Sequence, residues 1–172
     1  GIAAIEIGKL LGARVIAAAS SDEKLAVAKA HGADAGVNYA TESLRDRVKA
    51  LTDDKGVDVV FDPVGGDAFE QSVRCIGWEG RILVIGFASG AIPKVATNMI
   101  LVKNFSTVGV VFGEHSWRYP DDTRARLTAI LPEIAKGALG PRVWKASPLA
   151  EAIPALRAIQ NRQVIGKMVL TL

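Results

Sequence analysis

The sequence has little cysteine and no long apolar run. Cys75 is its one cysteine among 172 residues, so an internal disulfide and any zinc site built from several cysteines are excluded. We interpret Cys75 as a small buried apolar residue, as most free cysteines are. Charges interrupt every apolar stretch before it reaches the ~18–20 residues of a membrane-spanning helix. We therefore expect a protein of the reducing cytoplasm with no membrane partner.

The sequence also lacks a strong surplus of one charge and a concentration of aromatic residues. The 21 Lys and Arg residues are balanced by 18 Asp and Glu residues, and aromatic residues make up only 6% of the chain. A nucleic-acid-binding surface needs a basic stripe or a stacking platform, so we expect no nucleic-acid partner. Because 49% of the residues are hydrophobic, the chain can bury the core of one globular domain.

Helix and strand patterns alternate along most of the chain. Helices are predicted from the first residue to Gly12 and then over 22–31, 42–51 and 69–76. Apolar strand segments are predicted over 14–19, 36–39, 57–61, 81–86 and 106–112, whereas 99–103 is predicted to be irregular. Such alternation is typical of a parallel sheet covered by helices on both faces. The predicted fold is therefore α/β, with a Rossmann-type doubly wound parallel sheet.

Both ends of the chain depart from this rhythm. A doubly wound sheet starts with a strand, but this chain starts with a helix, so we expect a fragment or a processed chain that lacks its first strand. After residue 113 the patterns predict a long helix over 121–136, a short strand at 143–144, a helix over 149–159 and a strand over 164–172. We therefore divide the chain into a nucleotide-binding domain, 1–113, and a C-terminal α/β segment, 114–172.

The beginning of the chain carries a weak signal for a dinucleotide. Such folds bind pyrophosphate at the N-terminus of the first helix, but only Gly1 is present of the glycine-rich fingerprint. The next strand ends at Ala19, where NAD-preferring folds place an acidic residue. Ser20, Ser21 and Lys24 follow, and hydroxyls with a cation suit a ribose 2′-phosphate. The residues alone leave open that the serines only cap a helix and that Lys24 is solvated.

Five segments in fixed order carry a family resemblance. They are GIAAIEIGKLLGARVIAAASSDEKLAVAKAHGADAGVNY at 1–39, FDPVGG at 61–66, GRILVIGFASG at 80–90, VGVVFG at 108–113 and NRQVIGKMVL at 161–170. With them, essentially the whole chain resembles the medium-chain dehydrogenases/reductases, and within these the quinone oxidoreductases. The resemblance implies that an N-terminal GroES-like catalytic domain is absent from this chain. It also implies that the C-terminal segment packs on that domain.

The resemblance implies that the chain binds NADP(H). Gly1 and Lys167 would lie beside the pyrophosphate, and the residues around Ser20 and Tyr39 would surround the 2′-phosphate and the adenosine. Residues after the later strands would line the nicotinamide ribose, and Val111 would offer backbone groups to the carboxamide. Plainer roles stay open for Tyr39 as an edge cover, for Gly86 as a turn glycine and for Lys167 as a solvated lysine. The expected cofactor-binding residues are Gly1, Ser20, Ser21, Lys24, Tyr39, Val64, Gly65, Gly86, Phe87, Ser89, Val111 and Lys167.

The implied activity is hydride transfer from NADPH to a quinone or a conjugated carbonyl. The residues identify no catalytic group, and we expect no metal, because His31, Cys75 and His115 do not match the family's ligand positions. Without the catalytic half, the chain alone is expected to be inactive as an enzyme. Two alternatives stay open: a zinc-dependent alcohol dehydrogenase of the same superfamily, and a non-catalytic dinucleotide-binding or dimerisation module.

The strand over 106–112 is expected to form a homodimer. In the family this strand commonly pairs with its copy across a two-fold axis. The segment is rich in β-branched residues and contains no proline, so it can pair along an edge. The alternative is that the chain's own tail covers this strand.

Overall fold

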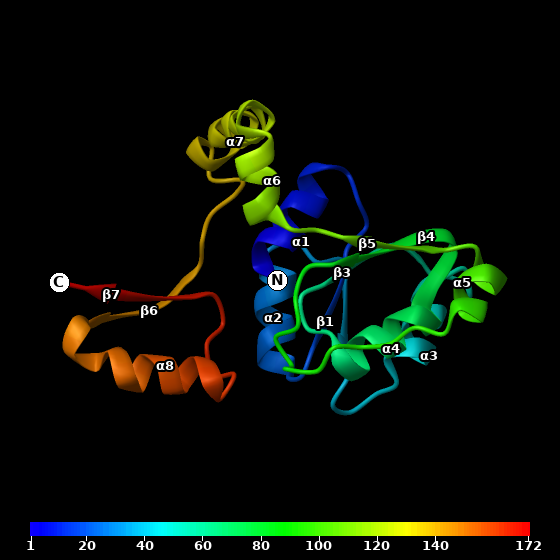
Figure 1. Ribbon diagram of the computed structural model, residues 1–172. Coiled ribbons are helices and arrows are strands. Elements are labelled where there is room, and N and C mark those ends of the chain that lie inside the picture. Colours follow the sequence, from blue (N-terminus) through cyan, green and yellow to red (C-terminus); the bar gives the residue numbers. More distant parts are fainter. The chain divides into compact units, whose positions relative to one another are not determined.

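The computed structural model describes residues 1–172. Its residues fall into two units. The terminal unit contains residues 1–17, 21–36 and 128–172, and the central unit contains residues 18–20 and 37–127. Helices and strands alternate along the chain (Figure 1), and every strand pair whose register is defined is parallel. The predicted α/β class with parallel strands is confirmed.

The terminal unit begins with two short helices. Helix α1 spans Ile2–Leu10 and helix α2 spans Asp22–Ala30. Ile5 of α1 is buried against Ala28 and Ala33 at the end of α2. Asp34 strengthens this contact, because its carboxylate accepts hydrogen bonds from Lys9 Nζ at 2.8 Å and from the Val15 N–H at 2.7 Å.

The end of the terminal unit is a strand–helix–strand segment. Strand β6 spans Val143–Pro148, the 3₁₀ helix η1 spans Leu149–Glu151, helix α8 spans Ala152–Gln160 and strand β7 spans Lys167–Thr171. The two strands are parallel, with Val143 opposite Lys167 and Ser147 opposite Leu170. Helix α7, Pro120–Ala135, precedes this segment along the chain.

A three-stranded parallel sheet forms the centre of the central unit. Its strands are β3 at Val57–Asp62, β4 at Ile76–Val84 and β5 at Ser106–Gly109, in the order β3-β4-β5. Helix α4, Gly66–Cys75, packs Phe69 and Val73 against Ile76, Ile82 and Phe105. Ile82 is fully buried, so the central strand β4 holds the middle of the core. The remaining helices are α3 at Leu44–Leu51, α5 at Thr97–Lys103 and α6 at Phe112–Arg118.

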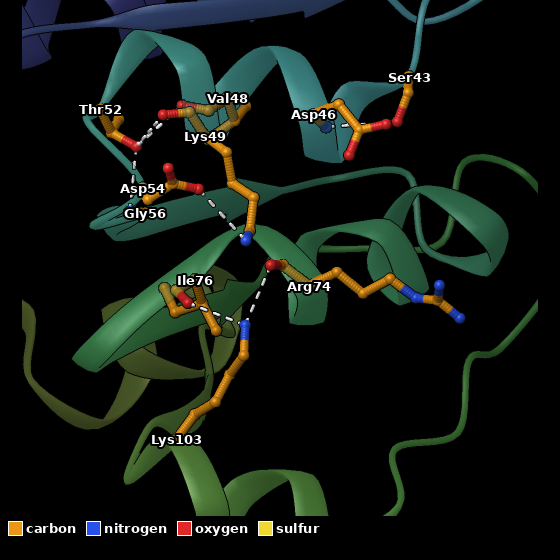
Figure 2. Close-up of polar contacts among 10 residues, drawn as sticks. All are labelled: Ser43, Asp46, Val48, Lys49, Thr52, Asp54, Gly56, Arg74, Ile76 and Lys103. Carbon is orange, nitrogen blue, oxygen red and sulfur yellow. Dashed lines mark hydrogen bonds and ion pairs between the residues drawn. The ribbon is translucent and has the colours of Figure 1, made fainter.

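Polar side chains satisfy the backbone groups at the ends of α3 and α4 (Figure 2). The Lys103 ammonium donates to the carbonyls of Val73, Arg74 and Ile76 at 2.9, 3.0 and 3.1 Å, and Figure 2 shows the bonds to Arg74 and Ile76. The Val73 and Arg74 carbonyls belong to the last turn of α4 and have no partner within the helix. A cation there also meets the negative end of the helix dipole. Burial lowers the pKa of Lys103. The contact fastens α5, and with it the start of β5, to the end of α4.

The strands β1 and β2 form a separate pair. Strand β1 spans Ile16–Ala19 and strand β2 spans Ala35–Asn38. They are hydrogen-bonded to each other but not to the sheet β3-β4-β5. In the usual doubly wound order the strand before the first helix lies between these two groups. The two groups of strands form separate sheets.

Several predicted boundaries are wrong. Residues 97–103, expected to be irregular around 99–103, form helix α5, because Met99 and Ile100 pack on the core of the central unit. The strand expected over 106–112 ends at Gly109, and Phe112 already belongs to α6. The helix expected over 69–76 ends at Cys75, and β4 starts at Ile76 rather than at Arg81. β-Branched runs predict extended structure, but tertiary packing decides where a strand ends.

No helix is both long and apolar enough to span a bilayer.

Candidate functional site

The loops that follow β3 and β4 are joined to each other at the carboxyl edge of the sheet. The Ala88 N–H donates to the Pro63 carbonyl at 3.1 Å, and the Ser89 N–H donates to the Val64 carbonyl at 3.0 Å. Parallel strands of an open α/β sheet bind ligands at this edge. The structure thus brings together four of the predicted residues, Val64, Gly65, Phe87 and Ser89, in one pair of loops.

A buried carboxylate fixes the first of these loops. Asp62 is only 5% exposed, and its Oδ1 accepts the N–H groups of Val64 at 2.8 Å and Gly65 at 3.0 Å. We did not single out Asp62 from the sequence, although it lies inside the FDPVGG segment. An Asp directly after an apolar strand and before Pro and Gly is the signal that could have identified this turn.

Gly65 has a conformation and surroundings that other residues do not tolerate. Its φ of 70° is in the left-handed region. A Cβ atom at this position would lie 2.9 Å from the Ala91 carbonyl oxygen and 2.9 Å from Phe87 Cδ1. Any larger residue would push the two loops apart, so Gly65 is required for their close approach.

The chain leaves the same edge of the sheet at the end of β5. The Val110 N–H donates to the Val84 carbonyl at 3.0 Å, which extends the pairing of β5 with β4 by one step. Val111 follows as the N-cap of α6 and is 68% exposed. Its carbonyl accepts the His115 N–H, whereas its own N–H makes no hydrogen bond. A backbone donor at this position is what the sequence analysis expects for a carboxamide.

The N-terminus of α1, in the terminal unit, offers a positive environment. No acidic residue lies in the first turn of α1, so its free N–H groups and the helix dipole are not neutralised. Burial and then the charge of Lys167 lower the pKa of the Gly1 amino group. Lys167 of β7 therefore lies close enough to Gly1 to add positive charge at the start of α1. The roles of both residues at a pyrophosphate stay predictions.

The start of α2 is compatible with both roles considered for Ser20 and Ser21, which are helix capping and binding of a 2′-phosphate. Ser21 is the N-cap, and its Oγ accepts the Lys24 N–H at 3.4 Å. Asp22 and Glu23 occupy the first turn, where carboxylates favour the helix dipole. The Lys24 ammonium is in no ion pair and is half-buried. Ser21 thus has a structural role, and Lys24 retains a charge that an anion could use.

The predicted residues Ser20 and Tyr39 lie at the end of the strand pair β1-β2. The Tyr39 N–H donates to the Ala19 carbonyl at 3.1 Å, so Tyr39 is held beside the residue that precedes Ser20. The Tyr39 ring is 41% exposed. Gly86 follows β4. A Cβ atom at this position would lie 3.6 Å from the Pro63 carbonyl oxygen, which is an ordinary van der Waals contact. The binding roles of these residues stay predictions.

No three His, Cys, Asp or Glu side chains come together to hold a metal ion. Cys75 is buried, and burial raises the pKa of its thiol. His31 Nδ1 instead lies 2.7 Å from Glu6 Oε1, and His115 Nε2 lies 2.8 Å from Asp122 Oδ2. Both imidazoles are therefore engaged by a carboxylate. Within the terminal unit, Lys24 and Lys167 supply positive charge, and within the central unit the joined loops supply glycines and backbone donors.

Known proteins are similar to this chain in sequence and in fold. Residues 1–128 match the family model of the zinc-binding dehydrogenases. A quinone oxidoreductase-like protein 2 homolog from Nematostella vectensis is 39% identical over 172 residues, which are 99% of this chain and 47% of that protein. The chain thus spans about half the length of the curated relatives that it matches.

Solved structures give the same result. The quinone oxidoreductase of Escherichia coli, solved in complex with NADPH, matches with a TM-score of 0.86 and 26% identity over 100% of this chain and 53% of that one. An NAD-dependent alcohol dehydrogenase matches with a TM-score of 0.86 and 36% identity over 99% of this chain and 47% of that one.

Proposed function

The chain belongs to the zinc-binding dehydrogenase family of the medium-chain dehydrogenases/reductases, and from this premise we propose that it is the cofactor-binding half of an NADPH-dependent quinone or enone oxidoreductase. The observation that carries the proposal is the pair of joined loops after β3 and β4, with Ser89 and Val64 linked by a 3.0 Å hydrogen bond. This pair lies at the edge where doubly wound sheets bind dinucleotides.

The proposed cofactor is NADP(H), whose phosphates fit the charges of the chain. The N-terminus of α1 with Lys167 suits the pyrophosphate, because no carboxylate of the first turn opposes it. Ala19 in place of an acid, followed by Ser20, Ser21 and Lys24, suits the 2′-phosphate. Tyr39 would cover the adenosine. Gly86, Phe87 and Ser89 would line the nicotinamide ribose, and the Val111 N–H would bind the carboxamide.

The proposed substrate is a quinone or a conjugated carbonyl compound. The relatives' names support this substrate class. NADPH supplies a hydride, and the protein orients the nicotinamide and keeps water away from it. Because the chain spans about half of its relatives' length, we propose that residues 1–113 bind the nucleotide, that 114–172 pack on a catalytic domain, and that the chain alone binds cofactor without turnover.

A second candidate is a zinc-dependent alcohol dehydrogenase using NAD. The similarity to an NAD-dependent alcohol dehydrogenase favours it, whereas Ala19 disfavours NAD, because no acid is available for the ribose 2′-hydroxyl. Metal analysis of the complete gene product separates the two enzymes. A third candidate, a non-catalytic dinucleotide-binding or dimerisation module, would bind NADPH but reduce no quinone.

We further propose a homodimer in the cytoplasm. Strand β5 is at the edge of its sheet and is exposed along its whole length. An open edge of this kind invites pairing with another strand, and a two-fold axis would satisfy both copies at once.

The direct test of the function is NADPH oxidation by the complete gene product with tetramethyl-1,4-benzoquinone as acceptor. We expect quinone-dependent oxidation without added zinc and with little turnover of ethanol. Turnover of alcohols that is lost on chelation would support the second candidate, and NADPH binding without any turnover would support the third.

A further inference from the structure

Helix α6 and the start of α7 carry a cluster of titratable side chains for which the cofactor site has no use. His115 Nε2 lies 2.8 Å from Asp122 Oδ2, and Arg126 Nε donates to the same oxygen at 2.6 Å. The rings of His115 and Tyr119 are in contact, with centroids 5.1 Å apart. These four residues, His115, Tyr119, Asp122 and Arg126, are called the His115 cluster here.

The cluster lies one helical turn beyond the carboxyl edge of the sheet. Val110 is still bonded to β4 through the Val84 carbonyl, and the His115 N–H donates to the Val111 carbonyl at 3.0 Å in the first turn of α6. If Val111 binds the carboxamide, as we propose, then His115 lies close to the reactive end of the cofactor. The inference therefore rests on the proposed function.

The hydrogen bonds determine which imidazole nitrogen is available. Arg126 and then His115 lower the pKa of Asp122, so this carboxylate is ionised and accepts. His115 Nε2 must consequently carry a hydrogen and donate it to Asp122. Nδ1 makes no hydrogen bond within the protein, so it is the atom that can release or take up a proton. Such orientation of an imidazole by a carboxylate is typical of acid–base groups.

The surroundings of the cluster suit a flat, weakly polar substrate. Val111 and Phe112 are 68% and 59% exposed, and they precede His115 by four and three residues, so α6 presents apolar and aromatic surface on the same face as the imidazole. Pockets for small molecules combine mostly apolar walls with a few placed polar groups. The second ion pair of α6, Glu114 with Arg118 at 2.7 Å, involves neither His115 nor Asp122.

We propose that His115, oriented by Asp122, is the proton donor to the reduced quinone or enone. NADPH supplies the hydride, which brings two electrons and one hydrogen to the substrate, and the cofactor is oxidised to NADP⁺. The substrate oxygen becomes negatively charged. The His115 Nδ1–H bond then breaks and an O–H bond forms on the substrate. The imidazole is left neutral, and its Nε2–H still donates a hydrogen bond to Asp122. Solvent returns the proton to Nδ1.

The test compares H115N and D122N with E114Q, which breaks the neighbouring ion pair and serves as the matched control. In the complete gene product, with tetramethyl-1,4-benzoquinone as acceptor, H115N should lower kcat by about 100-fold or more. The wild-type rate should fall as the pH rises, because the donor must carry a proton, and the H115N rate should be flat. E114Q should keep both the wild-type rate and its pH profile.

Two further measurements separate this inference from the proposed function. NADPH affinity, measured by fluorescence, should be the same in H115N as in the wild type. In NMR spectra of this chain, which has two histidines, the quinone with NADP⁺ should shift the His115 imidazole signal and leave that of His31 in place. Normal NADPH binding and turnover with an unchanged H115N pH profile would overturn the role of His115. Loss of NADPH binding by the wild type would overturn the proposed function instead.

Discussion

At the scale of single residues, Lys24 is the residue that we propose to distinguish NADPH from NADH. A charge-assisted contact with a phosphate contributes about 1.5–3 kcal/mol, which corresponds to about a tenfold change in affinity or more. We expect K24A to weaken NADPH by at least that factor and to leave NADH nearly unchanged, as measured by fluorescence titration. K29A, in the last turn of the same helix, is the control. Equal weakening of both cofactors by K24A would contradict the assignment.

Asp34 makes the contact between α1 and α2 sensitive to acid. The hydrogen bonds from Lys9 and then from Val15 lower the pKa of Asp34 in the folded state. The stability that Asp34 contributes is therefore present above its unfolded pKa of about 3.9 and is lost as the pH falls through the lower folded value. We expect D34N to lower Tm at about pH 7 and to match the wild type at about pH 2. D58N, on an exposed carboxylate, should leave Tm unchanged at both pH values, and a D34N effect independent of pH would contradict this account.

At the scale of elements, Lys103 fastens α5 to the end of α4. Its ammonium donates hydrogen bonds to three carbonyls at the end of α4. Without the ammonium, water would reach some of these carbonyls and replace part of the lost hydrogen bonds. We expect K103M to reduce the free energy of unfolding by about 1–3 kcal/mol, measured by urea denaturation of this chain. K94M changes an exposed lysine that makes no ion pair, and it should be neutral. A neutral K103M would show that water fully replaces the ammonium.

The edge strand β5 allows a test of the proposed dimer by a proline substitution. V110P is unsuitable as the disrupting variant, because the Val110 N–H is bonded to the Val84 carbonyl within the chain, so V110P would damage the sheet itself. Because N–H groups alternate in direction along a strand, that of Thr107 points to the open edge. We expect T107P to be monomeric in light scattering while it keeps NADPH affinity. A dimer that survives T107P would place the interface elsewhere.

The sequence predicts the elements of this fold better than their limits. Apolar runs and glycine stops identified β3, α2 and α7 within a few residues, because burial and capping are local signals. Helix α5 was missed, since it is short and depends on the packing of Met99 and Ile100. The division of the strands into β1-β2 and β3-β4-β5 was not predicted, because no local pattern encodes which strands pair.

At the scale of the whole molecule, the structure shows how some of the predicted site residues are brought together, which the sequence did not predict. The FDPVGG and GRILVIGFASG segments pointed to Val64, Gly65, Phe87 and Ser89. In the structure a hydrogen bond joins Ser89 to Val64, and Gly65 lies close to Phe87. Asp62 escaped notice, because its role is the capture of two backbone N–H groups, which only the folded turn reveals. The His115 cluster likewise depends on the angle between α6 and α7.

The central claim is that the chain binds NADP(H) and that Ser20, Ser21 and Lys24 hold its 2′-phosphate. Calorimetric titration of this chain with NADPH and with NADH tests this claim most directly. We predict one site per chain and an NADPH affinity at least about tenfold above that for NADH, with the difference removed by K24A. The preference should weaken as salt concentration rises, since charges carry it. Equal affinity for the two cofactors, or binding of neither by the folded chain, would contradict the account.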